Sequence, residues 1–143
     1  MKTYSVAETK KVGMLLARKH SKSPLLKGAL VIGLYGELGS GKTTFVQGVA
    51  KGFGVKGKVQ SPTFVLIRRH VARQGRTVVH IDCWRLKKGQ ELVRLGWREI
   101  IKNPLNVVLV EWAERVESIL PKGALRMRFR VVSPDVRTIE SRH

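Results

Sequence analysis

The most constraining stretch of this sequence is GELGSGKTT, residues 36–44. It begins with a match to the pattern G-x-x-x-x-G-K-[ST], in which glycines allow backbone turns that aim N–H groups at phosphates. In that pattern the lysine reaches the outer phosphates and the hydroxyl group after it holds Mg²⁺. The motif requires a buried strand before the loop and a helix after it, so it constrains the fold together with the ligand.

Both flanks of the loop meet this requirement. Residues 29–35, ALVIGLY, form a short and almost wholly apolar run, which is typical of a central strand buried on both faces. Residues 42–53 have helix-compatible character, so the loop would present its N–H groups at the positive end of a helix. We expect the following residues to contact the nucleotide: Gly36, Glu37, Leu38, Gly39, Ser40, Gly41, Lys42, Thr43 and Thr44.

The rest of the chain predicts one domain of mixed α/β structure over residues 1–143. Residues 6–20 place apolar side chains at roughly helical spacing, and Ser5 with Glu8 fits a capping box. Beyond the loop and its helix, the patterns predict strands at 64–70, 77–82, 106–111 and 125–132, helices at 90–101 and 113–120, and a turn at 73–76.

The first two of these later strands are joined so briefly that they must be antiparallel. The sheet is therefore expected to be mixed. Together with the phosphate-loop motif, this pattern predicts a P-loop NTPase-like three-layer sandwich, in which helices flank a mixed central sheet.

The chain carries 28 lysines and arginines against 10 acidic residues, a net charge of +18. A positive field of this size attracts nucleic acid, anionic surfaces or acidic partners. The basic residues are spread along the whole chain, as they would be on the solvated surface of any broadly basic protein. Both explanations stay open at the level of sequence.

Cysteine content and hydropathy indicate the cellular compartment in which the chain works. Cys83 is the only cysteine, which excludes an internal disulfide and a Cys-rich metal site. The N-terminal residues mix acidic and basic side chains, and no apolar run approaches membrane-spanning length. We expect a soluble cytoplasmic protein that does not enter a membrane.

Two carboxylates follow apolar strands. Glu111 comes after the apolar run VVLV, where burial without a partner is costly, and a bound Mg²⁺ held jointly with Thr43 would be that partner. The alternative interpretation is that Glu111 only starts the next helix. Asp82 ends the strand TVVHID, where it could either cap the next segment or polarise an attacking water. His80 is more typical of a satisfied core network than of catalysis.

Thr63, in the loop sequence SPTF, is a further candidate. Many phosphate-loop proteins keep a threonine in this loop that senses the γ-phosphate and completes the metal shell. A hydroxyl that serves only the turn is an equal alternative for Thr63.

Taken together, the motifs indicate a family more specifically than any one of them does alone. GELGSGKTT, SPTF, HIDCWRL, ELVRLGWREI and VEWAER, in that order, resemble the bacterial TsaE family over residues 6–121. The resemblance implies a small P-loop ATPase that uses ATP and Mg²⁺ and works with TsaB and TsaD in making N6-threonylcarbamoyladenosine in tRNA. In that system TsaD transfers the threonylcarbamoyl group, and ATP hydrolysis by the TsaE-like protein supports repeated turnover.

The family's functional residues can be carried over where the motifs match. The resemblance assigns Lys42 to phosphate, Thr43 and Glu111 to the metal, Thr63 to a switch, Asp82 to the catalytic carboxylates, Trp112 to the site and Thr9 to the vicinity of the base. Two positions depart from the family, which usually has tyrosine where this chain has Trp84 and proline where it has Ala113. Neither change alters a metal or phosphate group.

Two other functions use the same loop. A small-molecule kinase would need an acceptor pocket and usually an arginine-bearing lid, for which a chain of this length has little room. A basic tRNA-binding module with a structural loop would bind nucleic acid in a steeply salt-dependent manner, whatever residue stands at Lys42. Because the chain is strongly positive, direct contact with tRNA is also possible if the protein is an ATPase.

Overall fold

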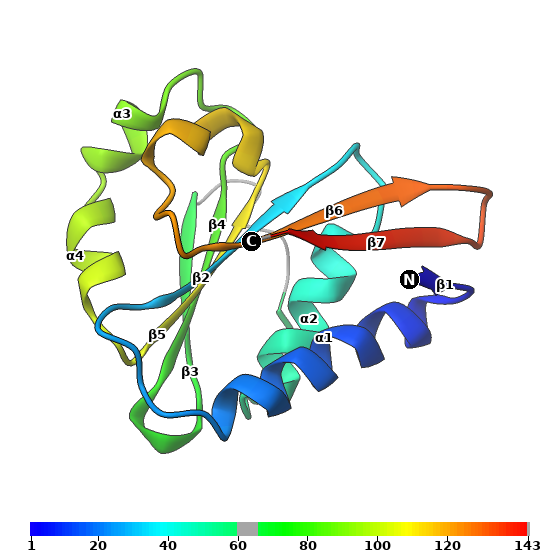
Figure 1. The fold of residues 1–143 in the computed structure, drawn as a ribbon, viewed down its shortest axis with the longest axis horizontal. Coiled ribbons are helices and arrows are strands. Elements are labelled where there is room, and N and C mark those ends of the chain that lie inside the picture. Colours follow the sequence, from blue (N-terminus) through cyan, green and yellow to red (C-terminus); the bar gives the residue numbers. More distant parts are fainter. Residues whose placement is uncertain (60–65, 143) are drawn as a thin grey trace.

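The computed structural model describes residues 1–59 and 66–142, and within them the chain forms a seven-stranded sheet in the order β1-β7-β6-β2-β5-β4-β3 (Figure 1). The elements are β1 (Lys2–Thr3), α1 (Val6–Ser21), β2 (Leu30–Tyr35), α2 (Lys42–Gly52), β3 (Ile67–Val71), the 3₁₀ turn η1 (Arg73–Gly75), β4 (Thr77–Asp82), α3 (Gly89–Val93), α4 (Trp97–Lys102), β5 (Asn106–Glu111), the 3₁₀ helix η2 (Ala113–Ile119), β6 (Leu125–Val131) and β7 (Arg137–Arg142).

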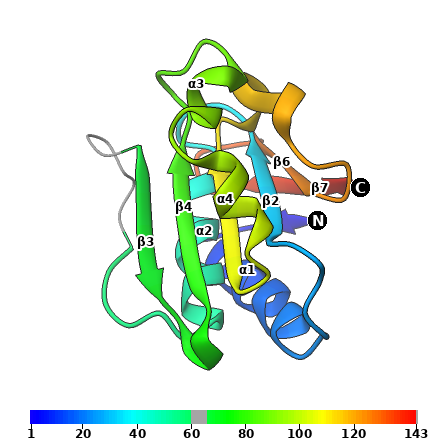
Figure 2. The same cartoon turned by 90° about the vertical axis from the view of Figure 1, so that its left-hand side faces the viewer.

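Helices cover both faces of the central strands. α1 and α2 pack on one face, and α3, α4 and η2 lie on the other (Figure 2). Successive residues of β2 alternate between the two cores, with Ile32 and Leu34 facing α1 and α2 and Val31 facing the other layer. The predicted three-layer α/β sandwich is confirmed.

The centre of the sheet is parallel and its margins are antiparallel. β2 lies between β5 and β6 and is parallel to both, and β4 is parallel to β5. β3, β7 and β1 are added in antiparallel orientation, which confirms the mixed sheet. The carboxyl ends of β2, β4 and β5 therefore meet at one edge, where Asp82 and Glu111 are register partners.

Helix α1 approaches α2 very closely. A Cβ atom on Gly48 would lie 2.1 Å from the Lys10 carbonyl oxygen, so only glycine allows this contact between the two helices. This packing holds the helix that follows the phosphate loop against the rest of the layer. No helix within the described residues is long and apolar enough to cross a membrane.

Several local predictions need correction. The helix expected at 90–101 is two short helices, α3 and α4, because Gly96 between them has a φ of +97°. The helix expected at 113–120 is the 3₁₀ helix η2, which is kinked at Val116. Strands β1 and β7 have no counterpart in the sequence predictions. The strand expected at 64–70 is described from Ile67 onward, and its first residues lie outside the described part of the chain.

Candidate nucleotide-binding site

A cavity of about 270 Å³ opens at the carboxyl edge of the parallel strands. It is lined by residues from the loop, the strand ends, α1 and the β6–β7 turn: Ser5, Val6, Thr9, Glu37, Leu38, Gly39, Ser40, Gly41, Lys42, Thr43, Thr44, Asp82, Glu111, Trp112, Pro134, Asp135 and Arg137. The structure therefore brings together almost all the residues that the sequence singled out. Thr63 lies outside the described residues, so its assignment stays a prediction.

The loop takes its shape from glycines. Gly36 does not line the cavity, but it turns the chain out of β2 with a φ of +140°, and a Cβ atom there would lie 2.5 Å from the Phe129 carbonyl oxygen. Gly41, with a φ of +103°, is the N-cap of α2 and offers no side chain to the first N–H groups. The first turn of α2 has no acidic residue, so its positive end is available to an anionic ligand.

The amino group of Lys42 lies at the base of the loop. It donates hydrogen bonds to the carbonyl oxygens of Gly36 and Glu37, the latter at 3.1 Å, and lies 4.2 Å from the centre of the Trp112 ring. Burial lowers the pKa of Lys42, and nearby carboxylates, with Glu111 the strongest, oppose that shift. Phosphate oxygens would be stronger partners for this cation than the two carbonyl groups.

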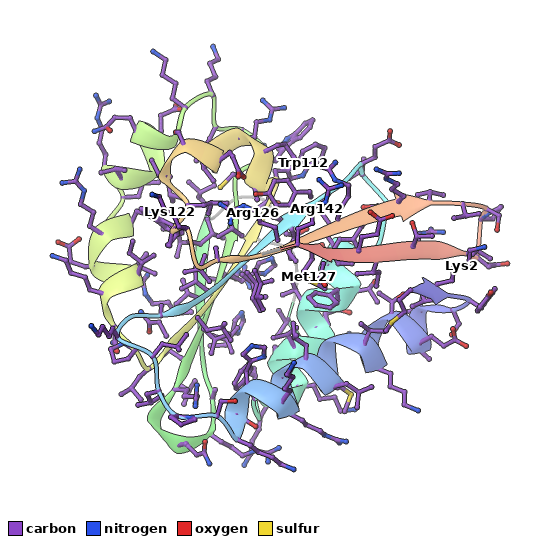
Figure 3. The ribbon with its side chains drawn as sticks, viewed as in Figure 1. Lys2, Trp112, Lys122, Arg126, Met127 and Arg142 are labelled. Atoms are coloured by element: carbon purple, nitrogen blue, oxygen red, sulfur yellow. The ribbon has the colours of Figure 1, made fainter. Side chains whose placement is uncertain are left out.

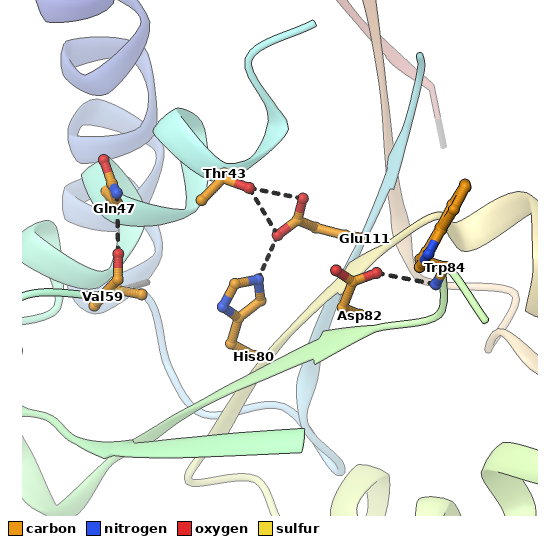
Figure 4. Close-up of polar contacts among 7 residues, drawn as sticks. All are labelled: Thr43, Gln47, Val59, His80, Asp82, Trp84 and Glu111. Carbon is orange, nitrogen blue, oxygen red and sulfur yellow. Dashed lines mark hydrogen bonds and ion pairs between the residues drawn. The ribbon is translucent and has the colours of Figure 1, made fainter. Parts of the chain in front are cut away.

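Thr43, Glu111 and His80 form a buried polar chain (Figure 4). The Thr43 hydroxyl donates to Glu111, with Oγ1 3.0 Å from Oε1 and 3.2 Å from Oε2. On the other side, His80 Nε2 lies 2.5 Å from Glu111 Oε2, and the His80 side chain is completely buried. Glu111 is therefore held between a hydroxyl and an imidazole, and it does not begin a regular α-helix.

The Thr43 and Glu111 oxygens fit a magnesium ion. Mg²⁺ prefers oxygen ligands and is usually held by one or two protein groups together with substrate phosphates and water. In residues 1–59 and 66–142 no group of three or more His, Cys, Asp or Glu side chains could hold a metal. The Thr43 hydroxyl and the Glu111 carboxylate are oxygen ligands of the kind that could hold such an ion together with phosphate.

Asp82 lies at the end of β4, beside Glu111 in the register of the sheet. Its Oδ1 accepts a hydrogen bond of 2.9 Å from the Trp84 backbone N–H, so the capping contact that the sequence allowed is present (Figure 4). Asp82 also lines the cavity. Asp82 can both cap the next segment and act on a water molecule, because the capping hydrogen bond fixes the direction of the carboxylate.

The aromatic residues next to the site are in contact, with the Trp84 and Trp112 rings tilted by 53°. Trp112 follows β5 with a φ of +58°, which is uncommon outside glycine, and its ring centre lies 5.3 Å from that of the exposed Trp84. The Arg115 guanidinium lies about as near to both rings, at 5.9 and 6.0 Å. Trp112 thus covers Lys42 on one side and contacts Trp84 on the other.

Thr9 is buried at the α1 side of the cavity. Its hydroxyl lies 2.8 Å from the hydroxyl of Thr3 and donates to the Ser5 carbonyl at 3.3 Å. Thr9 therefore has polar partners without any ligand. Thr9 lines the cavity, and its place beside a nucleotide base stays a prediction.

Sequence reasoning missed the contribution of the last hairpin. Arg137 of β7 donates to the Gly39 carbonyl at 3.2 Å and to the Ser133 carbonyl at 2.8 Å, which ties the β6–β7 turn to the phosphate loop. Pro134 and Asp135 of the same turn also line the cavity. No motif marks these residues, and only the pairing of β7 with β6 could have placed them here.

A model of the family described as "Threonylcarbamoyl adenosine biosynthesis protein TsaE" matches residues 3–139 of this chain. The chain belongs to the TsaE family. The resemblance drawn from the motifs is confirmed, and the match extends beyond the residues that carried it.

Curated TsaE proteins from distant bacteria are similar over most of their length. The proteins named tRNA threonylcarbamoyladenosine biosynthesis protein TsaE from Haemophilus influenzae and Treponema pallidum are each 33% identical to this chain. The alignments cover 92% of this chain and 78% of the first protein, and 94% of this chain and 93% of the second. The TsaE protein of Streptomyces coelicolor is 39% identical over 79% of this chain and 75% of its own length.

A solved structure has the same fold. The crystal structure of YdiB from Bacillus subtilis superposes with a TM-score of 0.76 at 31% sequence identity, over 97% of this chain and 80% of that one. The TsaE family membership and the phosphate-loop fold therefore rest on independent comparisons of sequence and structure.

Proposed function

We propose that this chain is the ATP-binding and ATP-hydrolysing member of the machinery that makes threonylcarbamoyladenosine in tRNA. The observation that carries the proposal is the hydrogen bond between Thr43, directly after the phosphate loop, and Glu111 at the end of β5. The names of the TsaE relatives supply the process in which this chemistry is used.

The loop and Lys42 would bind the triphosphate. The first turn of α2, which has no side-chain cap, lies at the cavity, where the positive end of the helix dipole favours negative charge. Lys42 would exchange its two carbonyl partners for oxygens of the β- and γ-phosphates. Trp112, whose ring lies over the amino group, would keep water away from that contact.

Thr43 and Glu111 would hold Mg²⁺ together with phosphate oxygens. The ion, when bound, would neutralise charge that develops on the β- and γ-phosphates during transfer. His80 would orient Glu111 from the buried side, as outer-shell partners of metal ligands do.

Asp82 would position the attacking water. Its carboxylate lies on the cavity wall and is held by the Trp84 N–H, and it is the register partner of Glu111 on the neighbouring strand. A carboxylate so placed can accept a hydrogen bond from water and direct it in line with the γ-phosphate. Thr63, which lies outside the described residues, would sense the γ-phosphate.

We infer hydrolysis instead of transfer to an acceptor, because the carboxylates of Asp82 and Glu111 line the cavity beside Lys42 and can direct a water molecule. We further propose that proteins of the TsaB and TsaD type complete the active state in the cytoplasm, and that turnover by the isolated chain is slow.

Product analysis separates hydrolysis from kinase activity. The pure protein is incubated with ATP, Mg²⁺ and candidate acceptors, with and without a TsaB–TsaD pair from the same organism. The proposal predicts ADP and inorganic phosphate in equal amounts, at a rate raised by the pair. Stoichiometric formation of a phosphorylated small molecule would show that the chain is a kinase.

A further inference from the structure

The outer face of the β6–β7 hairpin carries a row of arginines. Along β6, Met127 and Phe129 face the core under α1 and α2, so Arg126, Arg128 and Arg130 face the other way. Figure 3 labels Met127 and Arg126 from the two sides of the strand. The cross-strand partner of Arg126 on β7 is Arg142. These four residues, Arg126, Arg128, Arg130 and Arg142, are called the arginine face below.

Apart from η2, whose Glu117 pairs with Arg126, no helix of the described residues covers the arginine face (Figure 1). The helices on that side of the sheet pack over β2, β5 and β4, and the hairpin extends away from them (Figure 1). Arg128, Arg130 and Arg142 are exposed, and Arg126 is half-buried. The same hairpin is well packed on its inner side, where Phe129 contacts Phe45 of α2 edge to face.

The arginine face is short of counter-charges. Arg126 is paired with Glu117 at 2.9 Å, and Arg128 lies over the Tyr35 ring and opposite Glu140. Within the part of the chain that the structure describes, the other three arginines have no carboxylate within 4.0 Å. Like charges placed directly opposite in a sheet, as Arg126 and Arg142 are, destabilise the pairing. An anionic ligand would relieve that repulsion.

We propose that the arginine face binds the phosphodiester backbone of RNA. Arginine presents a planar donor fork that matches phosphate oxygens in a bidentate manner. Alternate residues of β6 lie about 6.6 Å apart and point in one direction, so they can contact several phosphates in turn. The proposal holds or fails independently of ATP hydrolysis.

RNA is a better candidate ligand than an acidic protein, because the arginine face has no apolar centre. Specific protein interfaces usually have an apolar or aromatic centre. The outward residues paired across β6 and β7 are arginines, Thr138 and Glu140, and the exposed apolar residue that follows in the same row, Val132, lies at the turn end of the hairpin and not at its centre. Phosphate contacts need no such centre, because electrostatics supplies most of the affinity in backbone binding.

The hairpin also links this face to the nucleotide cavity. Its turn supplies Pro134 and Asp135 to the cavity wall, and Arg137 contacts Gly39 of the phosphate loop. RNA bound on the arginine face would therefore lie on the element that borders the nucleotide.

Binding of a fluorescent unmodified tRNA transcript to the full-length protein tests the proposal. The triple variant Arg128→Gln/Arg130→Gln/Arg142→Gln is compared with a control of equal charge, Arg69→Gln/Arg94→Gln/Arg98→Gln, whose exposed arginines lie on β3, beside α3 and on α4. We expect the first variant to lose at least about tenfold in affinity and about two units of the slope of log K against log salt. The control should lose less than half of either quantity.

A lysine variant and an acidic polymer complete the experiment. Replacement of the same three residues by lysine keeps the charge but not the bidentate fork, so it should restore part of the affinity and shows that the loss is not a folding defect. Equal losses in the triple variant and its control would overturn the proposal in favour of a diffuse basic surface. Poly-L-glutamate that binds as tightly as tRNA through the same arginines would also overturn it, in favour of an acidic protein partner.

Discussion

The centre of the sheet and the β6–β7 hairpin are both built from β-strands, but they differ in which faces of the strands are buried. The strands β2, β4 and β5 are apolar on both faces, and the polar side chains of Glu111 and His80 are buried among them, with His80 Nε2 paired to Glu111. On the hairpin one face is apolar and the other is charged and exposed. Burial at the centre permits precise chemistry on a small ligand, whereas exposure on the hairpin permits contact with a large one.

The two regions share the β2–β6 ladder and the core under α1 and α2, and a polar contact joins them on the opposite side of the sheet. Tyr35 at the end of β2 donates to Glu117 of η2, and Glu117 accepts from Arg126 of β6. If the two regions have separate functions, variants in one should leave the function of the other intact.

The largest expected effect is the loss of hydrolysis in Lys42→Ala. Its amino group is the one lysine nitrogen at the base of the loop, and removal of a charged group that stabilises the transition state costs on the order of 10²–10³ in rate. Phosphate release and tRNA binding are measured on the same preparation. Hydrolysis should fall by that factor with tRNA affinity unchanged, and the arginine-face triple variant should show the reverse pattern. Parallel loss of both functions in either variant would contradict the separation.

The next effect is expected at the two strand-end carboxylates. Asp82→Asn and Glu111→Gln keep the shape of the side chains but remove the charges, so hydrolysis should fall by about 100-fold. ATP affinity should change less, because the loop and Lys42 remain. Single-turnover hydrolysis and equilibrium binding of a non-hydrolysable analogue separate the two quantities. A hydrolysis rate near wild type in Asp82→Asn would remove that residue from the site.

A smaller effect is expected for His80→Ala. The imidazole contacts only Glu111 among the described groups within hydrogen-bond distance, and loss of an outer-shell partner typically costs 10- to 100-fold in metal affinity or activity. We expect about a tenfold rise in the Mg²⁺ concentration for half-maximal hydrolysis. His20→Ala in the last turn of α1 is the matched control and should stay within about twofold, since a substitution away from the site rarely costs more than about 0.5 kcal/mol. If both variants behave alike, His80 is a packing residue.

The smallest effect concerns the contact between the regions. Hydrogen bonds from Tyr35 and Arg126 lower the pKa of Glu117 against the opposing effect of burial. A lowered carboxyl pKa gives stability that is present above the unfolded value and is lost as pH falls through the folded value. Glu117→Gln should therefore cost less than about 1 kcal/mol near pH 7, and still less at pH 3. Thermal unfolding at both pH values measures the difference, and a larger cost at pH 3 would contradict this account.

The centre of the sheet was predictable because burial leaves a clear signal in sequence. The apolar runs before Gly36 and Glu111 can hardly be placed anywhere except in buried strands, and the loop motif orders the segments around them. The positions of Lys42, Thr43 and Glu111 follow from that arrangement. The alternation of arginine and apolar residues likewise indicated β6 and its single wet face.

The margins of the sheet were not predictable for the opposite reason. β7, RTIESR, has Ile139 as its one buried residue, and β1 is two residues long, so neither carries a period that could be recognised. Both strands exist because a neighbour offers unpaired backbone groups. Arg137 was missed together with β7. The break between α3 and α4 depends on the positive φ of Gly96, which an isolated glycine in a helical pattern does not reveal.

The central claim is that ATP hydrolysis at the buried end of the sheet serves the synthesis of threonylcarbamoyladenosine. The direct test is the amount of this nucleoside formed in unmodified tRNA over many turnovers by a TsaB–TsaD pair, supplied with threonylcarbamoyl donor and either the wild-type chain or Lys42→Ala. The account predicts sustained product formation with the wild-type chain and a halt near one turnover with Lys42→Ala. Equal yields with the two proteins would contradict it.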